Sequence, residues 1–256
     1  MSEILTATCK DKAINIECKR PGWESVRKAY AKINEIFKNV YLQYYNKAIN
    51  TQTQALEALE LANKHGAEAI FKHIGGGLYN EFLSNEALIE KQKIQGIKPN
   101  EVRRHTLNSC ALRISYALNY SYLLDSQYLI KNKKLPIDIG KCQYENKRFY
   151  GADGNLYYLG IYGVRNFLTL NWGNSDKPYN IITFSDASQA KKFYNEKFSK
   201  FSKNGIVVMR IKGFSDAGGH TTLWNGANKM FEDSEISNNY LSGKYEVKDF
   251  QFWELV

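Results

Sequence analysis

The chain has 256 residues, enough for one large domain or two small ones, and 43% hydrophobic residues predict an ordinary globular core. Its four cysteines are too few for a disulfide scaffold and none lies in a C-x-x-C pair, so we expect no metal site and no other cofactor. The formal net charge of +9 suits an anionic partner, but the lysines are scattered singly and no nucleic-acid-binding signature occurs, so we expect no nucleic acid.

The first residues contain neither a basic start nor a long apolar run, and no later stretch approaches the ~20 apolar residues of a membrane-spanning helix. We therefore expect a chain that is synthesised in the cytoplasm without a signal peptide, does not insert into membranes, and is exported by another machine. Residues 1–19 alternate weakly, as a strand or a loose tail would. Cys9 and Cys18 are near enough in sequence to close a small loop.

A helical pattern follows the turn at Pro21-Gly22-Trp23. Apolar residues recur there at spacings of three and four, as on one helix face: Val26, Tyr30, Ile33 and Phe37. The pattern continues to about residue 72 and predicts a long helical hairpin over 24–72. The glycines at 75–77 are expected to end it, and a second helical stretch lies within 84–105.

The second half of the chain contains short aromatic and β-branched runs that are separated by turns. The expected strands are 156–159, 181–184, 206–211, 221–224 and 250–253. Helical stretches interrupt them at 164–170 and 187–201. Helices first and strands later indicate an α+β fold rather than alternating β/α units. Because no clean linker is visible, we expect a single domain over residues 1–256.

Cys110 opens an amphipathic helical pattern. The apolar residues of one face are Ala111, Ile114, Ala117 and Leu118. Asn108 or Ser109 is a suitable N-cap, which places Cys110 in the first helical turn, where the helix dipole stabilises a thiolate. The alternative is a buried structural cysteine, because cysteine is among the most frequently buried residue types.

His220 opens a strand-like pattern in which Thr222 and Trp224 share its face. Gly218 and Gly219 leave room beside the histidine for another backbone or for a substrate. Near neutral pH, a histidine can accept a thiol proton and later donate it to a leaving amine. A cysteine and a histidine in these settings indicate a thiol hydrolase, and the alternative is a histidine with a purely structural role.

Two segments resemble the type VI secretion amidase effectors of the fourth family, a toxin class within the papain-like cell-wall peptidases. They are Asn108-Ser-Cys-Ala-x-Arg-x-Ser-x-Ala-Leu-Asn119 and Gly219-His-x-Thr-Leu-Trp-Asn-Gly226. Shorter pieces support the resemblance in order along the chain: Pro21-Gly-Trp23, Trp172-Gly173, Lys203-Asn-Gly-Ile206 and Phe252-Trp-Glu-Leu255. The stretch from about 34 to 70 does not resemble the family. We interpret it as a helical insertion, either an adaptor for recognition or a cover over an apolar patch.

The resemblance implies a papain-like α+β fold with N-terminal helices packed on an antiparallel sheet. It implies hydrolysis of the amide between D-glutamate and meso-diaminopimelate in peptidoglycan stem peptides, with Cys110 as nucleophile and His220 as base, then acid. The family places an aspartate after the histidine strand. Here the candidates are Glu232, Asp233 and Glu235, and we favour Asp233. The residues expected to contact the substrate are Asn108, Ser109, Gly219 and Trp224.

The resemblance also implies partners and a place of action. A toxin of this kind is injected by a secretion apparatus into the periplasm of a rival bacterium. Its producer needs a cognate periplasmic immunity protein, which we expect to plug the cleft at Cys110. The alternatives are a housekeeping cell-wall endopeptidase, which normally carries a signal peptide, and a non-catalytic basic binding protein with Cys110 merely buried.

Overall fold

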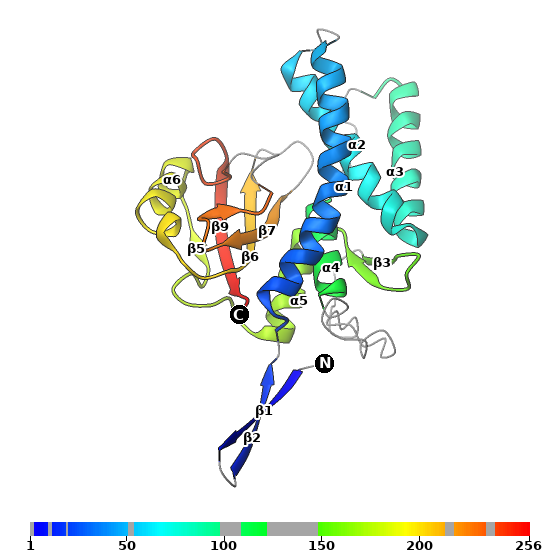
Figure 1. The fold of residues 1–256 in the computed structure, drawn as a ribbon. Helices are drawn as coiled ribbons and strands as arrows, with labels where there is room; N and C mark the ends of the chain where they lie inside the picture. Colours follow the sequence, from blue (N-terminus) through cyan, green and yellow to red (C-terminus); the bar gives the residue numbers. More distant parts are fainter. Residues whose placement is uncertain are drawn as a thin grey trace.

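The computed structural model describes residues 3–9, 12–18, 20–50, 54–97, 109–121, 148–212, 218–233 and 239–256. After an N-terminal β-hairpin, helices precede an antiparallel sheet, which confirms the expected α+β class (Figure 1). The elements are β1 (Glu3–Cys9), β2 (Lys12–Cys18), α1 (Trp23–Asn50), α2 (Ala55–Ile74), α3 (Gly76–Ile94), α4 (Cys110–Tyr120), β3 (Arg148–Tyr150), β4 (Leu156–Tyr158), α5 (Ile161–Trp172), β5 (Ile182–Thr183), α6 (Ala187–Glu196), η2 (Phe198–Lys200), β6 (Gly205–Lys212), β7 (Gly219–Asn225), β8 (Met230–Phe231) and β9 (Glu246–Glu254).

The main sheet has the strand order β5-β9-β6-β7-β8, and every neighbouring pair is antiparallel. Because side chains alternate along a strand, β6 contributes to two cores. Ile206 and Val208 face α4 and α5, whereas Val207 and Met209 face α6 and η2. The sheet therefore lies between two helical layers, with α6 on the side away from α1 and α4 (Figure 1).

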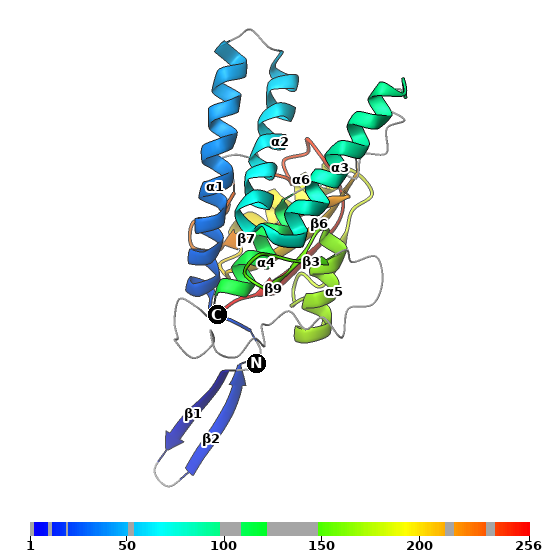
Figure 2. The same ribbon diagram turned by 90° about the vertical axis from the view of Figure 1, so that its right-hand side faces the viewer.

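Helices α1 and α2 form the long helical hairpin that the apolar pattern predicts (Figure 2). Its inner half packs as one core, in which Phe37 and Phe71 meet Leu112 and Tyr116 of α4. Gly75, with φ of 68°, ends α2, and α3 begins immediately afterwards. None of the helices in the described part of the chain is long and apolar enough to cross a membrane.

The expected insertion at about 34–70 begins inside α1, which runs through this position without interruption. It covers most of the α1–α2 hairpin, from Asn34 in α1 to Ile70 in α2. The inner turns of the same hairpin cover apolar side chains of α4. The boundaries of the insertion and the single-domain organisation stay predictions.

Strands β1 and β2 form a separate antiparallel hairpin that projects from the body (Figure 2). In its register Cys9 lies opposite Lys12, whereas Cys18 lies opposite Glu3. At the rise of a β-strand, the two cysteine Cα atoms are about 20 Å apart, and a disulfide needs about 4.4–6.8 Å. In this register the two cysteines are too far apart to close the small loop that their spacing in the sequence allows.

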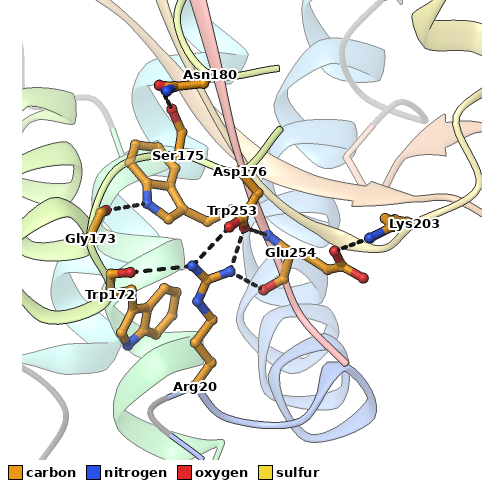
Figure 3. A network of polar contacts seen from close by, with 9 residues as sticks. All are labelled: Arg20, Trp172, Gly173, Ser175, Asp176, Asn180, Lys203, Trp253 and Glu254. Atoms are coloured by element: carbon orange, nitrogen blue, oxygen red, sulfur yellow. Dashed lines mark hydrogen bonds and ion pairs between the residues drawn. The ribbon is translucent and has the colours of Figure 1, made fainter. Parts of the chain in front are cut away.

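Arg20, just after this hairpin, is bound to the end of the chain (Figure 3). Its guanidinium makes two N–H···O bonds to Asp176, one of them at 3.1 Å, and donates to the Glu254 carbonyl at 3.0 Å. Asp176 also accepts the Glu254 amide at 2.7 Å. The arginine lies over the Trp172 ring, 5.5 Å from its centroid. These contacts fix the start of α1 against the end of β9.

Trp253 adds a second contact between the last strand and the end of α5. Its indole Nε1 donates to the Gly173 carbonyl at 3.1 Å (Figure 3). Gly205 must be a glycine because a Cβ there would lie 2.1 Å from the Trp253 carbonyl oxygen. Three of the short pieces that carry the family resemblance thus meet in one packing unit.

Candidate active site

Cys110 is the first residue of α4, as expected, and two polar side chains fix this helix against β4. The Ser115 hydroxyl accepts the Tyr158 amide at 3.1 Å, and Asn119 Nδ2 donates to the Leu156 carbonyl at 2.9 Å. Serine and asparagine four residues apart lie on one helix face. These two motif residues therefore hold the helix that presents the cysteine.

The start of α4 differs in one respect from the expectation. Ser109 occupies the cap position, and its carbonyl accepts the Arg113 amide at 2.9 Å. Its φ and ψ of −85° and −1° are helical, and its hydroxyl makes no capping bond among the described residues. The three amides before Arg113 therefore lack an intrahelical acceptor, as at any helix start. Asn108, the other expected cap and a substrate-contact candidate, lies outside the described residues.

His220 lies on β7, and a tight turn after this strand returns the chain to its side. Asn225 stabilises the turn, because its side chain accepts two turn amides at 3.1 and 3.0 Å and donates to Glu232 Oε1 at 2.8 Å. A Cβ on Gly226 would lie 2.3 Å from Ser202 backbone atoms, so only glycine fits there. The turn and β8 bring the chain back to β7 shortly before position 233.

Three of the expected catalytic residues meet at this point. His220 Nε2 lies 2.9 Å from Asp233 Oδ2, and Thr222 Oγ1 donates to Asp233 Oδ1 at 2.8 Å. The Cys110 side chain hydrogen-bonds the His220 imidazole. Since Nε2 is engaged by Asp233, Nδ1 is the nitrogen left for the cysteine. The Tyr240 ring stacks on the imidazole with a centroid distance of 4.0 Å.

The other two candidate acids are Glu232 and Glu235. Glu232 accepts from Arg27 of α1 at 2.8 Å and from Asn225, so it is committed to the turn and to the helix. Glu235 lies outside the described residues. In the part of the chain that the structure describes, no group of three or more histidine, cysteine, aspartate and glutamate side chains gathers as metal ligands would. Asp233 is the acid that contacts His220.

The cluster is buried: His220 is 5% exposed, Asp233 1% and Cys110 2%. Burial alone would lower the pKa of His220, but the charge and hydrogen bond of Asp233, with a contribution from Cys110, raise the pKa to about 9. Burial alone would raise the pKa of Asp233, but His220, and then Arg113 and Thr222, hold the pKa below its ordinary value. Asp233 therefore stabilises the imidazolium that forms when His220 takes a proton.

Arg113 and α1 form one wall of the cluster. The guanidinium Nη2 lies 3.7 Å from Asp233 Oδ2, and Nη1 donates to Asn34 Oδ1. The Tyr30 hydroxyl contacts Thr222 Oγ1 at 3.1 Å. Because Thr222 donates its proton to Asp233, Tyr30 is the donor in this contact. Sequence reasoning gave Arg113 no role, although a residue three positions after Cys110 shares its helix face.

Two of the residues expected to contact the substrate are enclosed by other parts of the chain. A Cβ on Gly219 would lie 2.1 Å from the Met209 carbonyl oxygen and 2.4 Å from Ile161 Cδ1, so β6 and α5 already fill the space beside it. Trp224 is fully buried, and its Nε1 donates to the Phe201 carbonyl at 3.2 Å. Gly219 and Trp224 therefore contribute to packing near the two ends of the histidine strand.

Comparison with known proteins places this cluster in a family context. The family model described as "Type VI secretion system (T6SS), amidase effector protein 4" matches residues 107–253. The Tae4 chain in the effector–immunity system Tae4/Tai4 of Salmonella typhimurium is 21% identical, with 93% of this chain and 99% of that chain covered and a TM-score of 0.51. The Tae4 chain in the effector–immunity complex of Enterobacter cloacae is 18% identical. The match covers 93% of this chain and 99% of that chain, with a TM-score of 0.50. These structures have the papain-like fold, which confirms the expected fold. No curated protein matches the sequence.

Proposed function

The chain belongs to the type VI secretion amidase effector 4 family, and from that premise we propose that it hydrolyses the γ-D-glutamyl–meso-diaminopimelate amide of peptidoglycan stem peptides by a cysteine mechanism. The observation that carries the proposal is the contact of one imidazole with both Cys110 and Asp233 inside a buried cluster. A structural cysteine has no need of an oriented imidazole–carboxylate pair beside it.

In the proposed mechanism, His220 takes the Cys110 proton and the thiolate attacks the carbonyl carbon of D-glutamate. The oxyanion that forms is stabilised by amide N–H groups in the first turn of α4, which have no intrahelical acceptors. When the C–N bond breaks, the imidazolium donates its proton to the departing amine of diaminopimelate. Water, deprotonated by His220, then hydrolyses the thioester and restores the thiol.

Asp233 serves this cycle by holding His220. Its Oδ2 bonds Nε2, which turns the other ring nitrogen toward Cys110 and stabilises the imidazolium that forms twice in each turnover. Thr222 and Tyr30 support the carboxylate from its other oxygen, since Tyr30 donates to Thr222 and Thr222 donates to Oδ1. Asp233 is thus fixed before substrate arrives.

The proposal extends to delivery and to a partner. The solved relatives are effectors in complex with the immunity protein Tai4. For this chain we expect export by a type VI apparatus, action on the wall of a target bacterium from its periplasm, and inhibition by a cognate immunity protein that covers the approach to Cys110.

Digestion of purified sacculi tests the function, with mass spectrometry of the released fragments and His220→Ala as the matched inactive variant. We expect the wild type to release fragments with a free diaminopimelate amino group and to leave glycan strands whose dipeptide stems end in D-glutamate. Intact sacculi, under conditions in which a control amidase digests them, would overturn the enzymatic proposal. Fragments cut elsewhere would keep the amidase and overturn the bond. Activity of wild-type magnitude in His220→Ala would overturn the mechanism.

A further inference from the structure

The buried cluster contains a second cation, Arg113, besides the His220 imidazole of the cysteine mechanism. In its ion-paired form, a thiolate at Cys110 and a carboxylate at Asp233 face a single imidazolium at His220. That trio has a net negative charge, and an uncompensated charge away from water is costly. Arg113 is a permanent cation whose side chain is 6% exposed, and it makes the buried group electrically neutral.

The position of the guanidinium suits a role through charge rather than through a direct bond. Its Nη2 lies 3.7 Å from Asp233 Oδ2, beyond hydrogen-bond range but within the range of a strong charge interaction. The titratable groups that face it come from every element packed around it. They are Tyr30 of α1, Cys110 of its own helix, Asp233 after β8 and Tyr240 before β9, with His220 of β7 beyond Asp233.

Helix α1 holds the guanidinium in this place. Asn34 Oδ1 accepts from Nη1, and the Phe37 ring lies 4.8 Å from the guanidinium carbon, in cation–π range. Arg27, on the same helix, forms an ion pair at 2.8 Å with Glu232, the residue before Asp233. Helix α1 therefore secures both the cation and the segment that carries the acid.

We propose that Arg113 is a positioning residue that α1 holds beside Asp233, where its charge neutralises the buried cluster and sets the pH range in which Cys110 reacts. This role rests on the proposed function, because it concerns the nucleophile of that reaction. It also assigns a purpose to the inner turns of the α1–α2 hairpin, which support the site as well as covering α4.

The test follows the alkylation rate of Cys110 from about pH 5 to 10 by site-resolved peptide mass spectrometry, which separates it from the other three cysteines. Loss of the cation favours proton binding by every member of the cluster. Arg113→Met should therefore shift the midpoint of the profile upward by about one pH unit or more. Arg113→Lys keeps the charge and should therefore return the midpoint most of the way to its wild-type value. The control is Arg210→Met, which removes a half-exposed ion pair with Asp249 on the same sheet.

A second pair of variants keeps the test decisive if Arg113→Met does not fold. Asn34→Asp places a negative charge against the guanidinium with almost no change of shape, and should shift the midpoint upward. Asn34→Ala removes one contact that holds the guanidinium but changes no charge, and should shift the midpoint less. Folded Arg113→Met or Asn34→Asp with a midpoint within about 0.3 pH unit of the wild type would overturn the proposal.

This readout needs no peptidoglycan, so it separates the two proposals. Intact sacculi together with a shifted profile would count against the enzymatic function alone. Digested sacculi together with an unmoved profile would overturn the role of Arg113 alone.

Discussion

Two arginine–aspartate pairs hold different parts of this molecule, and their geometries differ. Arg20 and Asp176, with side chains 22% and 28% exposed, bond directly through two N–H···O contacts beside the last strand (Figure 3). Arg113 and Asp233, with side chains 6% and 1% exposed, stay 3.7 Å apart. In the second pair the carboxylate oxygens are taken by His220 and Thr222.

The difference separates a structural ion pair from the proposed active site. Among the described residues, the Asp176 carboxylate accepts from a guanidinium and from a backbone amide, both of which are permanent donors. Asp233 instead uses one oxygen on an imidazole that can gain or lose a proton. Deep burial, a titratable neighbour and an arginine kept at charge distance mark the functional site, whereas an ion pair alone does not.

Removing each carboxylate in turn should give the largest contrast. Asp233→Asn should lower sacculus turnover by about 10²- to 10⁴-fold, because a neutral amide lacks the charge that stabilises the imidazolium. Asp176→Asn should lower the melting temperature and leave the turnover of the folded protein near that of the wild type. Turbidity loss of sacculi per mole of folded protein measures both. Equal losses of turnover in the two variants would contradict the different roles of Asp233 and Asp176.

Substitutions on the two faces of β7 test whether the surroundings of Asp233 act on turnover rather than on stability. Thr222→Val removes the donor to Asp233 Oδ1, a bond to a charged group worth about 1.5–3 kcal/mol, and should reduce turnover by roughly tenfold or more. Thr221→Val is the matched control, because its hydroxyl donates to the Val207 carbonyl on the opposite face. It should cost about 1 kcal/mol of stability in urea titrations without loss of turnover. A similar turnover in both variants would speak against the support of Asp233.

A change in the Arg20–Asp176 pair should alter the stability of the protein and leave its turnover unchanged. Arg20→Lys keeps the charge but loses the two-pronged bond to Asp176. A loss of about 1 kcal/mol corresponds to a melting temperature lower by about 2–4 °C in a chain of this size. Calorimetry and the sacculus assay at 25 °C measure the two effects. A fall in turnover with an unchanged melting temperature would place this network in the active site after all.

The smallest expected effect is the pH dependence of stability. The pKa of His220 is raised from 6.5 to about 9, so its contribution is fully present below about pH 6.5 and is lost as the pH rises through 9. The pKa of Asp233 is lowered from 3.8, so its contribution is present above that value and is lost on further acidification. His220→Gln should therefore flatten the decline in unfolding free energy between pH 6.5 and 9. Parallel declines in both proteins would contradict the assignment.

Local patterns predicted the elements that carry the site. Helical spacing after Cys110 and strand alternation around His220 are short-range signals, and both residues lie where the pattern indicates. Asp233 is favoured through the family resemblance instead, and it contacts His220. The same alternation placed Trp224 with His220 but gave no information on what packs there. Along a seven-residue strand, one end of that face meets α4 and the other meets η2.

The rest depends on contacts between distant segments. Asn34 and Arg113 are 79 residues apart, and no periodicity relates one helix to the other. Tyr240 stacks on His220 from a segment without a regular pattern. The separation of Cys9 from Cys18 follows from the register of a hairpin, which depends on where its turn forms.

The central claim is that Cys110 is the nucleophile, and the most direct measurement is sacculus turnover by Cys110→Ala, with folding verified by circular dichroism and melting temperature. The account predicts a folded protein that releases no stem-peptide fragments above background. The wild type should release them and, after acid quenching, carry a thioester-linked fragment on Cys110. A folded Cys110→Ala protein that digests sacculi at the wild-type rate would contradict the account.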